Sequence, residues 1–325
     1  MALGNLHFPE IPSHLQRLIT PPVVRNAAVV LAFWAMLRKL NMVLSNRALN
    51  NRTQNPPWDW RTEIAVVTGG CRGIGEDVVR KLAKCCINVI AIDLHPPEMP
   101  FPDNVIYYKA DVTKTDEFRK AAEEIRRDIG HPTVLINNAG VGSYGNILER
   151  PEAEVRQTFN VNIISHFITV KEFLPSMVEK NHGHIVTVAS MASFVSIANI
   201  IDYSCTKAAA LAFHEGLAQE LRHRYKAMNV RTSIIHPNWV RTPMIAELIE
   251  YKPNAERYLE PQDISDAIVK QVKSGKSGQI VMPSYYGFLS GIRGFPSWLQ
   301  EGIRNSRAGL LETPKDWVAS KEDAH

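Results

Sequence analysis

A β-branched run that ends in a glycine-rich turn limits this chain to a small number of folds. Residues 64–68 read IAVVT, and the chain continues through GGCRGIG at 69–75 into a helical stretch that reaches Lys84. A strand without alternating polar residues is expected where both faces of a sheet are covered. The pattern therefore predicts a parallel sheet with helices on both faces, beginning at residue 64.

The segments after Lys84 keep alternating between strand and helix. Further strands are predicted at 88–93, 105–109, 133–136, 184–188, 230–235 and 279–282, with helices at 115–129, 152–181 and 203–227. Such alternation is typical of a single Rossmann-like, doubly wound α/β sheet. The 325 residues, 45% of them hydrophobic, suffice for one substantial core. We divide the chain into an N-terminal segment and linker at 1–60, a catalytic domain at 61–284 and a C-terminal amphipathic extension at 285–325.

The glycine-rich turn has the form of a phosphate-binding loop. Gly69 permits a tight turn, Gly73 removes a side chain where a pyrophosphate must approach, and Gly75 lets helix and strand pack closely. The free N–H groups at the start of the helix would point at the phosphates. Glycine-rich turns alone are common, but this one lies between a strand and a helix and is followed by a well-placed acid. It predicts a dinucleotide site.

That acid is Asp93, at the end of the second predicted strand and 18 residues after Gly75. A carboxylate there can accept hydrogen bonds from the adenosine ribose and would repel a 2′-phosphate. Arg72 favours the opposite preference, because a guanidinium can hold a 2′-phosphate. An ordinary loop acid is the alternative for Asp93. Because Asp93 occupies the ribose position itself, the sequence favours NAD over NADP.

A tyrosine and a lysine four residues apart provide the candidate proton-transfer group. Tyr203 and Lys207 would share one face of a helix. An ammonium near a phenol lowers the phenol pKa from about 10 toward neutral pH, so that the phenol can exchange a proton while hydride moves to or from a nicotinamide. This spacing is frequent by chance. Ser190, 13 residues before Tyr203, would bind the same substrate oxygen, unless it merely caps the end of a strand.

Taken in order, these motifs resemble the short-chain dehydrogenase/reductase superfamily. The resemblance rests on TGGCRGIG at 68–75, Asp93, Asp111-Val112, NNAG at 137–140, Asn162, Ser190 and Tyr203-x-x-x-Lys207, and it covers residues 63 to about 282. It implies an NAD(P)-dependent alcohol dehydrogenase or ketoreductase.

The resemblance also implies a role for each matching residue. The catalytic tetrad would be Asn162, Ser190, Tyr203 and Lys207, with Asn162 holding a water that links Lys207 to solvent. Cofactor contacts would come from Gly69, Arg72, Gly73, Ile74, Gly75, Asp93, Asp111, Val112, Asn138, Ala139, Gly140, Tyr203, Lys207, Val240 and Thr242. Asn238 stands where the family has a glycine, which puts the conformation of that loop in doubt. No metal is predicted, because the four cysteines and the histidines lack ligand spacing.

The N-terminal segment reads as a membrane anchor. Residues 27–37 form an unbroken apolar run of eleven between Arg25-Asn26 and Arg38-Lys39, shorter than the roughly 20 residues that span a bilayer. Residues 1–60 carry six basic and two acidic side chains, and this excess of four equals the net charge of the whole chain. Residues 61–325 therefore have balanced charge, so no nucleic-acid partner is expected. An interfacial or shallow anchor is favoured over a helix packed on the chain's own core, with Trp34, Trp58 and Trp60 suited to the interface. A glycosylation triplet at 51–53 is expected to be unused.

Longer stretches, among them TVLINNAGVG, KEFLPSM and HGHIVTVASMASF, look like the retinol and 17-beta-hydroxysteroid dehydrogenase-like group. Members of that group act on lipophilic alcohols such as steroids, retinoids or long-chain lipids. They often lie on endoplasmic reticulum or lipid droplets, with an apolar segment ahead of the sheet. The resemblance therefore implies a membrane-associated enzyme whose catalytic domain faces the cytosol. By analogy with the superfamily, the tyrosine helix and residues 152–181 would form a homodimer.

The C-terminal part is expected to cover the substrate. Residues 237–260 would form a lid, and seven of them are candidates for an apolar lining: Trp239, Met244, Ile245, Leu248, Ile249, Tyr251 and Tyr258. They would serve equally well as helix core. The stretch 285–304 mixes aromatic, aliphatic and basic residues, which suits either a second interfacial helix near the pocket or docking on the core.

Two other functions remain compatible with the residues. One is an NADPH-dependent ketoreductase of a biosynthetic pathway, which Arg72 would favour. The other is a non-catalytic lipid-droplet scaffold, against which the complete tetrad argues.

Overall fold

The computed structural model describes residues 22–53, 57–142, 144–252 and 257–311. Predictions that concern residues 1–21, the lid residues 253–256 and the end of the C-terminal extension at 312–325 lie outside the described residues. The chain divides into two compact units, residues 1–49 and 50–325.

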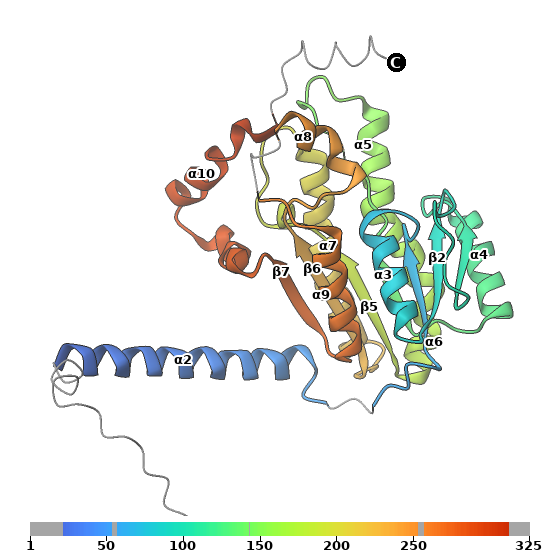
Figure 1. Cartoon of the computed structure of the whole chain (residues 1–325), viewed down its shortest axis with the longest axis horizontal. Helices are drawn as coiled ribbons and strands as arrows, with labels where there is room; N and C mark the ends of the chain where they lie inside the picture. Colours follow the sequence, from blue (N-terminus) through green and yellow to red (C-terminus); the bar gives the residue numbers. More distant parts are fainter. Residues whose placement is uncertain (1–21, 54–56, 143, 253–256, 312–325) are drawn as a thin grey trace, which may run out of the picture. The chain divides into compact units, whose positions relative to one another are not determined.

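One parallel sheet of seven strands forms the centre of the larger unit (Figure 1). In sheet order the strands are β3 (Val105–Lys109), β2 (Asn88–Asp93), β1 (Ile64–Thr68), β4 (Val134–Asn137), β5 (Gly183–Val188), β6 (Val230–Pro237) and β7 (Gly278–Met282). All seven predicted strands are confirmed to within two residues at their ends. The direction of strand order reverses between β1 and β4, and in open α/β sheets ligands bind outside the carboxyl ends of the strands at such a point.

Helices cover both faces of the sheet, as predicted. On one face α3 (Gly73–Lys84) and α9 (Pro261–Lys273) pack together, and Val79, Leu82 and Ile268 belong to a fully buried core. On the other face α4 (Thr115–Asp128), α6 (Ser165–Lys180) and α7 (Ile201–His223) contribute to a second core, which contains Phe118 and Phe173. The continuous apolar strands are thereby buried on both sides.

The helix predicted over residues 152–181 is interrupted. It consists of α5 (Glu152–Phe159), a π-helical turn η1 (Asn160–Ile164) and α6. The Asn162 side chain accepts a hydrogen bond from the Val141 backbone nitrogen (2.8 Å) and donates to the Thr206 hydroxyl (3.1 Å), and it is fully buried. These contacts pull the turn inward, and π-turns inside helices are frequent at functional sites.

The segment after β7 closes over the carboxyl ends of the strands. It contains η4 (Ser284–Gly294), α10 (Ser297–Asn305) and η5 (Ala308–Leu311). Leu289 and Ile292 pack on Met191 and Phe194, next to η2 (Met191–Ser193). Leu311 packs in a cluster with Leu248 of α8 (Ala246–Tyr251). This part of the extension therefore docks on the catalytic core.

The smaller unit contains the helix α2 (Pro22–Leu49). It is 28 residues long, or about 42 Å at 1.5 Å per residue, and it continues through Arg38 and Lys39 beyond the apolar run. Residues 24–49 are long and apolar enough to cross a membrane, and apolar side chains such as Leu31 (70% exposed) and Trp34 (60%) are open to solvent.

The residues directly after α2 are fixed on the larger unit. The Asn50 side chain accepts from the Ser277 backbone nitrogen (2.8 Å), and its carbonyl accepts from buried Arg231 (3.0 Å). The Asn51 amide donates to the Met228 carbonyl (2.9 Å). The amide of the glycosylation triplet is therefore already used within the fold.

The interpretation of Trp58 and Trp60 as membrane-interface residues is wrong. Both are half-buried against the first core, stacked with ring centroids 5.0 Å apart. Trp58 also lies on His182, at 4.1 Å between centroids. These indoles bury their apolar surface within the protein itself.

Candidate active site

A large cavity lies at the carboxyl ends of the strands, where the strand order reverses. Its volume is about 1130 Å³, and its walls come from the loops after β1, β2, β4, β5 and β6 and from the C-terminal extension. Pockets for one drug-sized ligand measure roughly 300–1,000 Å³, so this cavity has room for a dinucleotide together with a substrate. Every predicted site residue lines it except Gly75 and Asn162, which are buried beneath its wall.

The glycine loop fits a pyrophosphate. Helix α3 begins after Arg72 without a side-chain cap, so its first backbone N–H groups are available to an anion. Gly73 has φ +56°, and a Cβ at that position would meet nothing closer than Thr242, at 3.6 Å. The space above Gly73 therefore belongs to the cavity, as a close approach by phosphate requires.

Asn138 holds this loop in place, a role that the sequence did not reveal. Its amide donates to the carbonyls of Thr68 (3.1 Å) and Gly69 (3.0 Å), and its backbone nitrogen donates to the Thr68 hydroxyl (3.1 Å). The end of β4 is thus tied to the turn after β1. The motif NNAG marked the segment, but nothing in its spacing indicated the partner.

Two carboxylates, Asp93 and Asp111, line the cavity at the ends of β2 and β3. Asp93 accepts from the Cys71 backbone nitrogen (3.0 Å), which joins the end of β2 to the glycine loop. Asp111 accepts from the Thr113 backbone nitrogen (2.9 Å) and hydroxyl (2.7 Å). Since a carboxylate has about four lone-pair positions, both retain acceptor capacity toward a ligand.

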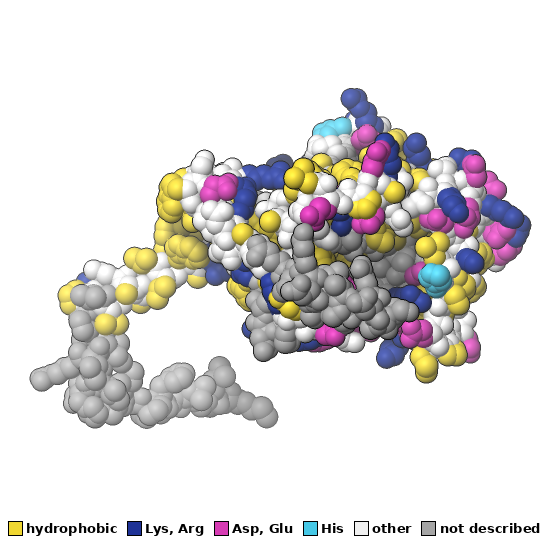
Figure 2. All heavy atoms as spheres, turned by 90° about the horizontal axis from the view of Figure 1, so that it is seen from above, with side chains coloured by type: hydrophobic (Ala, Val, Ile, Leu, Met, Phe, Trp, Pro, Cys, Tyr) yellow, Lys and Arg dark blue, Asp and Glu magenta, His cyan; other side chains and the backbone are white. Residues whose placement is uncertain are grey.

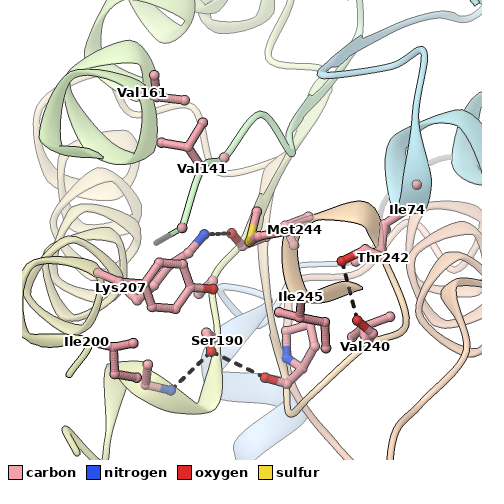
Figure 3. Close-up of a pocket in the computed structure, with 18 of the residues that line it drawn as sticks. Ile74, Val141, Val161, Ser190, Ile200, Lys207, Val240, Thr242, Met244 and Ile245 are labelled. Atoms are coloured by element: carbon pink, nitrogen blue, oxygen red, sulfur yellow. Dashed lines mark hydrogen bonds between the residues drawn. The ribbon is translucent and has the colours of Figure 1, made fainter. Parts of the chain in front are cut away.

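Tyr203, Lys207 and Ser190 come together at the other end of the cavity. Lys207 donates to the Val188 carbonyl at 3.0 Å, and its ammonium nitrogen lies 5.5 Å from the centroid of the Tyr203 ring. The Ser190 hydroxyl accepts from the Ala192 backbone nitrogen (3.1 Å) and also bonds to Tyr203. Figure 3 shows Lys207 and Ser190 facing Met244 and Ile245 across the cavity.

The expectation that Lys207 lowers the pKa of Tyr203 is not met in the protein chain itself. Burial raises the pKa of Tyr203, and the hydrogen bond from Ser190 opposes that rise. Burial also lowers the pKa of Lys207, from 10.5 to about 8. Each group alone therefore resists charge at this buried position. The four-residue spacing could not reveal this burial.

The histidines near Lys207 carry no charge at neutral pH. Burial, together with the smaller effect of the positive charge of Lys207, lowers the pKa of His166 to about 3 and that of His236 to about 4. Among the described cavity-lining residues the carboxylates are Asp93 and Asp111, at the ends of β2 and β3. Lys207 is therefore the dominant charge beside Tyr203.

Three of the four hydrogen-bonding positions of the Asn162 amide are filled. Its nitrogen donates to the Val141 carbonyl (2.9 Å) and to the Thr206 hydroxyl, and its oxygen accepts from the Val141 nitrogen. One lone pair of the amide oxygen remains for the water that the resemblance assigns to this residue.

We expect Lys207→Met to stabilise the fold at neutral pH while it abolishes the function of Lys207. The folded-state pKa lies below the unfolded value, so between pH 8 and 10.5 the unfolded chain holds a proton that the folded chain has lost. The contribution of Lys207 to the free energy of unfolding therefore rises from pH 8 to pH 10.5 and is lowest at and below pH 8. The difference in pKa corresponds to about 3 kcal/mol.

Urea unfolding of wild type and Lys207→Met at pH 7 and pH 10 measures this effect. The variant should be more stable at pH 7, and its advantage should shrink at pH 10. An advantage that is absent at pH 7, or that does not change with pH, would contradict the buried-charge argument.

The substrate end of the cavity is mostly apolar. Trp239, Met244, Ile245 and Leu248 line it as predicted, but Ile249, Tyr251 and Tyr258 do not. On α8 and the turn before it, positions 244, 245 and 248 share a face, and 249 and 251 lie on another. Tyr258 instead bonds to the Lys252 carbonyl (2.9 Å) and lies under Arg241.

Tyr144 was missed because its loop carries no recognisable motif. Its hydroxyl donates to the Glu247 carboxylate at 2.7 Å, and burial and this carboxylate both raise its pKa. It lines the cavity and packs in one cluster with Leu248 and Tyr203. The bond joins the loop after β4 to the lid helix α8.

Comparison with known proteins agrees with this geometry. The family model described as short chain dehydrogenase matches residues 63–252. Dehydrogenase RED2 of Cochliobolus heterostrophus is 50% identical over 201 residues, which cover 61% of this chain and 76% of that protein. Human estradiol 17-beta-dehydrogenase 11 is 30% identical over 236 residues (70% and 77%), and human 17-beta-hydroxysteroid dehydrogenase 13 is 30% identical over 244 (72% and 79%).

Solved structures share the architecture. Ligand-free aldohexose dehydrogenase of Thermoplasma acidophilum superposes with a TM-score of 0.61 at 22% identity, covering 69% of this chain and 93% of that one. The 3-ketoacyl-(acyl-carrier-protein) reductase of Brucella melitensis, complexed with NADH, gives 0.60 at 22% identity, covering 68% and 96%. At this identity the likeness concerns the fold alone.

Proposed function

The chain belongs to the short-chain dehydrogenase family, and from that premise we propose that it interconverts a lipophilic alcohol and its ketone or aldehyde. Family membership makes it an NAD(P)-dependent oxidoreductase that acts on CH–OH groups. The observation that carries the finer proposal is the apolar cavity end that meets Tyr203.

In this proposal the chain's own residues handle the proton. The nicotinamide of a bound dinucleotide supplies or accepts the hydride. Tyr203 would exchange the proton of the substrate oxygen, and the Ser190 hydroxyl would hold the same oxygen. Lys207, charged when the phenolate forms, would stabilise that phenolate. Asn162 would keep the loop at Val141 and the tyrosine helix in register.

The cofactor would lie along the loops after β1, β2 and β4. Gly69, Gly73, Ile74 and Arg72 would surround the pyrophosphate, with Gly75 beneath. The remaining proposed contacts, toward adenosine, the nicotinamide ribose and the carboxamide, are Asp93, Asp111, Val112, Asn138, Ala139, Gly140, Tyr203, Lys207, Val240 and Thr242.

Steroids, retinoids and long-chain alcohols are the substrate classes that suit the cavity. Its substrate end is walled by Trp239, Ile245, Leu248, Leu289 and Leu311. Relatives named for estradiol and 17-beta-hydroxysteroids support the same class.

Membrane association and pairing of two chains complete the proposal. The exposed apolar helix α2 supports attachment to endoplasmic reticulum or lipid droplets, with the catalytic unit in the cytosol. A homodimer through α7 and residues 152–181, which form α5, η1 and α6, is supported by exposed Ile164 of η1 (46%) and Phe167 of α6 (49%), which a partner would cover.

A screen of steroids, retinoids and fatty alcohols, followed by NADH or NADPH absorbance, tests the function. Turnover of at least one lipophilic class with NAD is expected. Turnover of small polar alcohols alone would overturn the substrate class.

We expect Asp93→Asn to reverse the cofactor preference. A hydrogen bond to a charged group contributes about 1.5–3 kcal/mol, so the dissociation constant for NAD should rise roughly ten-fold or more, while NADP should bind better once the repulsive charge is gone. The asparagine oxygen can still accept from the Cys71 nitrogen, which preserves the loop.

Calorimetric titration with both cofactors measures the change. Asp111→Asn is the matched control, because it should weaken the binding of NAD and of NADP equally. Tight binding of NADP but not NAD by the wild type would overturn the role of Asp93.

A further inference from the structure

The C-terminal extension carries an aromatic row that the fold leaves uncovered. In a 3₁₀-helix, residues three apart lie in one row along the axis. In η4 the row Tyr286, Leu289 and Ile292 faces the core that contains Met191. The neighbouring row begins with Tyr285 and Phe288 and faces outward.

These outward rings are large and open to solvent. Tyr285 is 55% exposed and Phe288 59%, and Trp298 on α10 is 76% exposed. We call these three residues the aromatic rim. Exposed apolar side chains that occur together mark an interaction site, and tryptophan and tyrosine favour the boundary between membrane and water.

One residue of the aromatic rim, Phe288, also lines the cavity. Its side chain is more than half exposed. Behind it the wall continues with Leu289 and Ile303. Phe288 thereby connects the exposed rim to the apolar wall of the cavity.

The described part of the extension carries a net positive charge, which suits an anionic surface, whereas residues 285–325 as a whole are neutral, with five basic and five acidic side chains. Residues 284–311 contain three arginines, at 293, 304 and 307, and one acid, Glu301, for a net charge of +3 − 1 = +2. Figure 2 shows hydrophobic side chains on this lobe, whereas acidic and basic side chains mix at the opposite edge over α4. Basic residues next to interfacial aromatics are attracted to anionic lipid headgroups.

We propose that the aromatic rim docks on an anionic lipid surface and that the cavity takes its substrate from that surface. The exposed residues of the aromatic rim support the docking, and the uptake of substrate rests on the proposed function. This contact is separate from α2, since it belongs to the catalytic unit.

Quenching of tryptophan emission by brominated lipids tests the docking. The full-length protein is added to vesicles of phosphatidylcholine and phosphatidylserine, with and without brominated acyl chains. The chain has six tryptophans, so the difference between wild type and Trp298→Phe isolates one of them. Because interfacial segments insert about 5–10 Å, bromine should remove roughly half or more of the Trp298 emission. Emission unaffected by bromine would overturn the proposal. Trp34→Phe reports on α2 separately.

A charge on the aromatic rim tests the uptake. Trp298 does not line the cavity, so Trp298→Glu should leave kcat for a short water-soluble alcohol within about two-fold while raising KM for a vesicle-dissolved alcohol about ten-fold, or roughly 1.4 kcal/mol. Met99→Glu, at a residue 66% exposed on another surface, is the matched control and should change neither value.

The outcomes separate this inference from the proposed function. Quenched Trp298 without turnover of any lipophilic alcohol upholds the docking and overturns the proposed substrate class. Turnover of a lipophilic alcohol with unquenched Trp298 upholds the proposed substrate class and overturns the docking. If the rim is instead covered by a second copy of the chain, Trp298→Glu will dissociate a dimer in the absence of lipid, and the lipid proposal falls.

Discussion

Tyr203→Phe is expected to lower kcat/KM by about 10²–10⁴-fold, because general acid–base catalysis contributes that range. The change removes the hydroxyl and leaves the ring, so the cluster with Leu248 and Trp239 stays packed. Affinity for the dinucleotide and the melting temperature should stay close to wild type. The loss should therefore appear in the chemical step alone, which single-turnover kinetics with NADH absorbance resolves.

Tyr144→Phe is the matched control, since it removes another phenol hydroxyl from a residue that lines the same cavity. It breaks the bond to Glu247 that joins a loop to the lid. We expect a loss below about ten-fold, the equivalent of one ordinary hydrogen bond. A Tyr203→Phe protein as active as wild type would revive the interpretation of the chain as a non-catalytic scaffold.

Gly75→Ala is expected to abolish dinucleotide binding and to destabilise the fold by at least about 3 kcal/mol, the upper range for overpacking. A Cβ on Gly75 would overlap the Gly69 carbonyl oxygen and lie 2.5 Å from the Asn138 amide nitrogen. Both neighbours are held by other bonds, so neither can move cheaply. Urea unfolding and cofactor titration measure the two effects.

Gly216→Ala provides the control, because nothing lies within 4 Å of the added methyl group and the position is within α7. That change should stabilise the protein by about 0.5–1 kcal/mol, since alanine favours a helix. A Gly75→Ala protein as stable as wild type would show that the turn after β1 can relax.

The sheet and the cofactor loop were predictable because their signals are local. Five β-branched or small residues followed by glycines specify a strand and its turn without any knowledge of distant contacts. The seven strands accordingly appear where the apolar runs stand in the sequence. Asn162 was found through the resemblance, but its π-turn depends on Val141 and Thr206, which only the fold brings near it.

Burial was the property that the sequence did not convey. Tryptophan suits either lipid or a protein core. Trp58 packs within the protein because His182 and Gly275 offer it a surface, and Trp60 stacks on Trp58. The Tyr203–Lys207 spacing predicted proximity correctly, yet the shift in pKa follows from desolvation, which a linear pattern does not contain.

Asn50 follows α2 directly in the chain and is fixed within the catalytic unit by Ser277 and Arg231. An enzyme whose α2 lay in a membrane, as proposed, would meet a lipid-dissolved substrate in two dimensions rather than three. Its rate would then depend on the mole fraction of alcohol in the lipid. Adding water around the membrane would leave that rate unchanged.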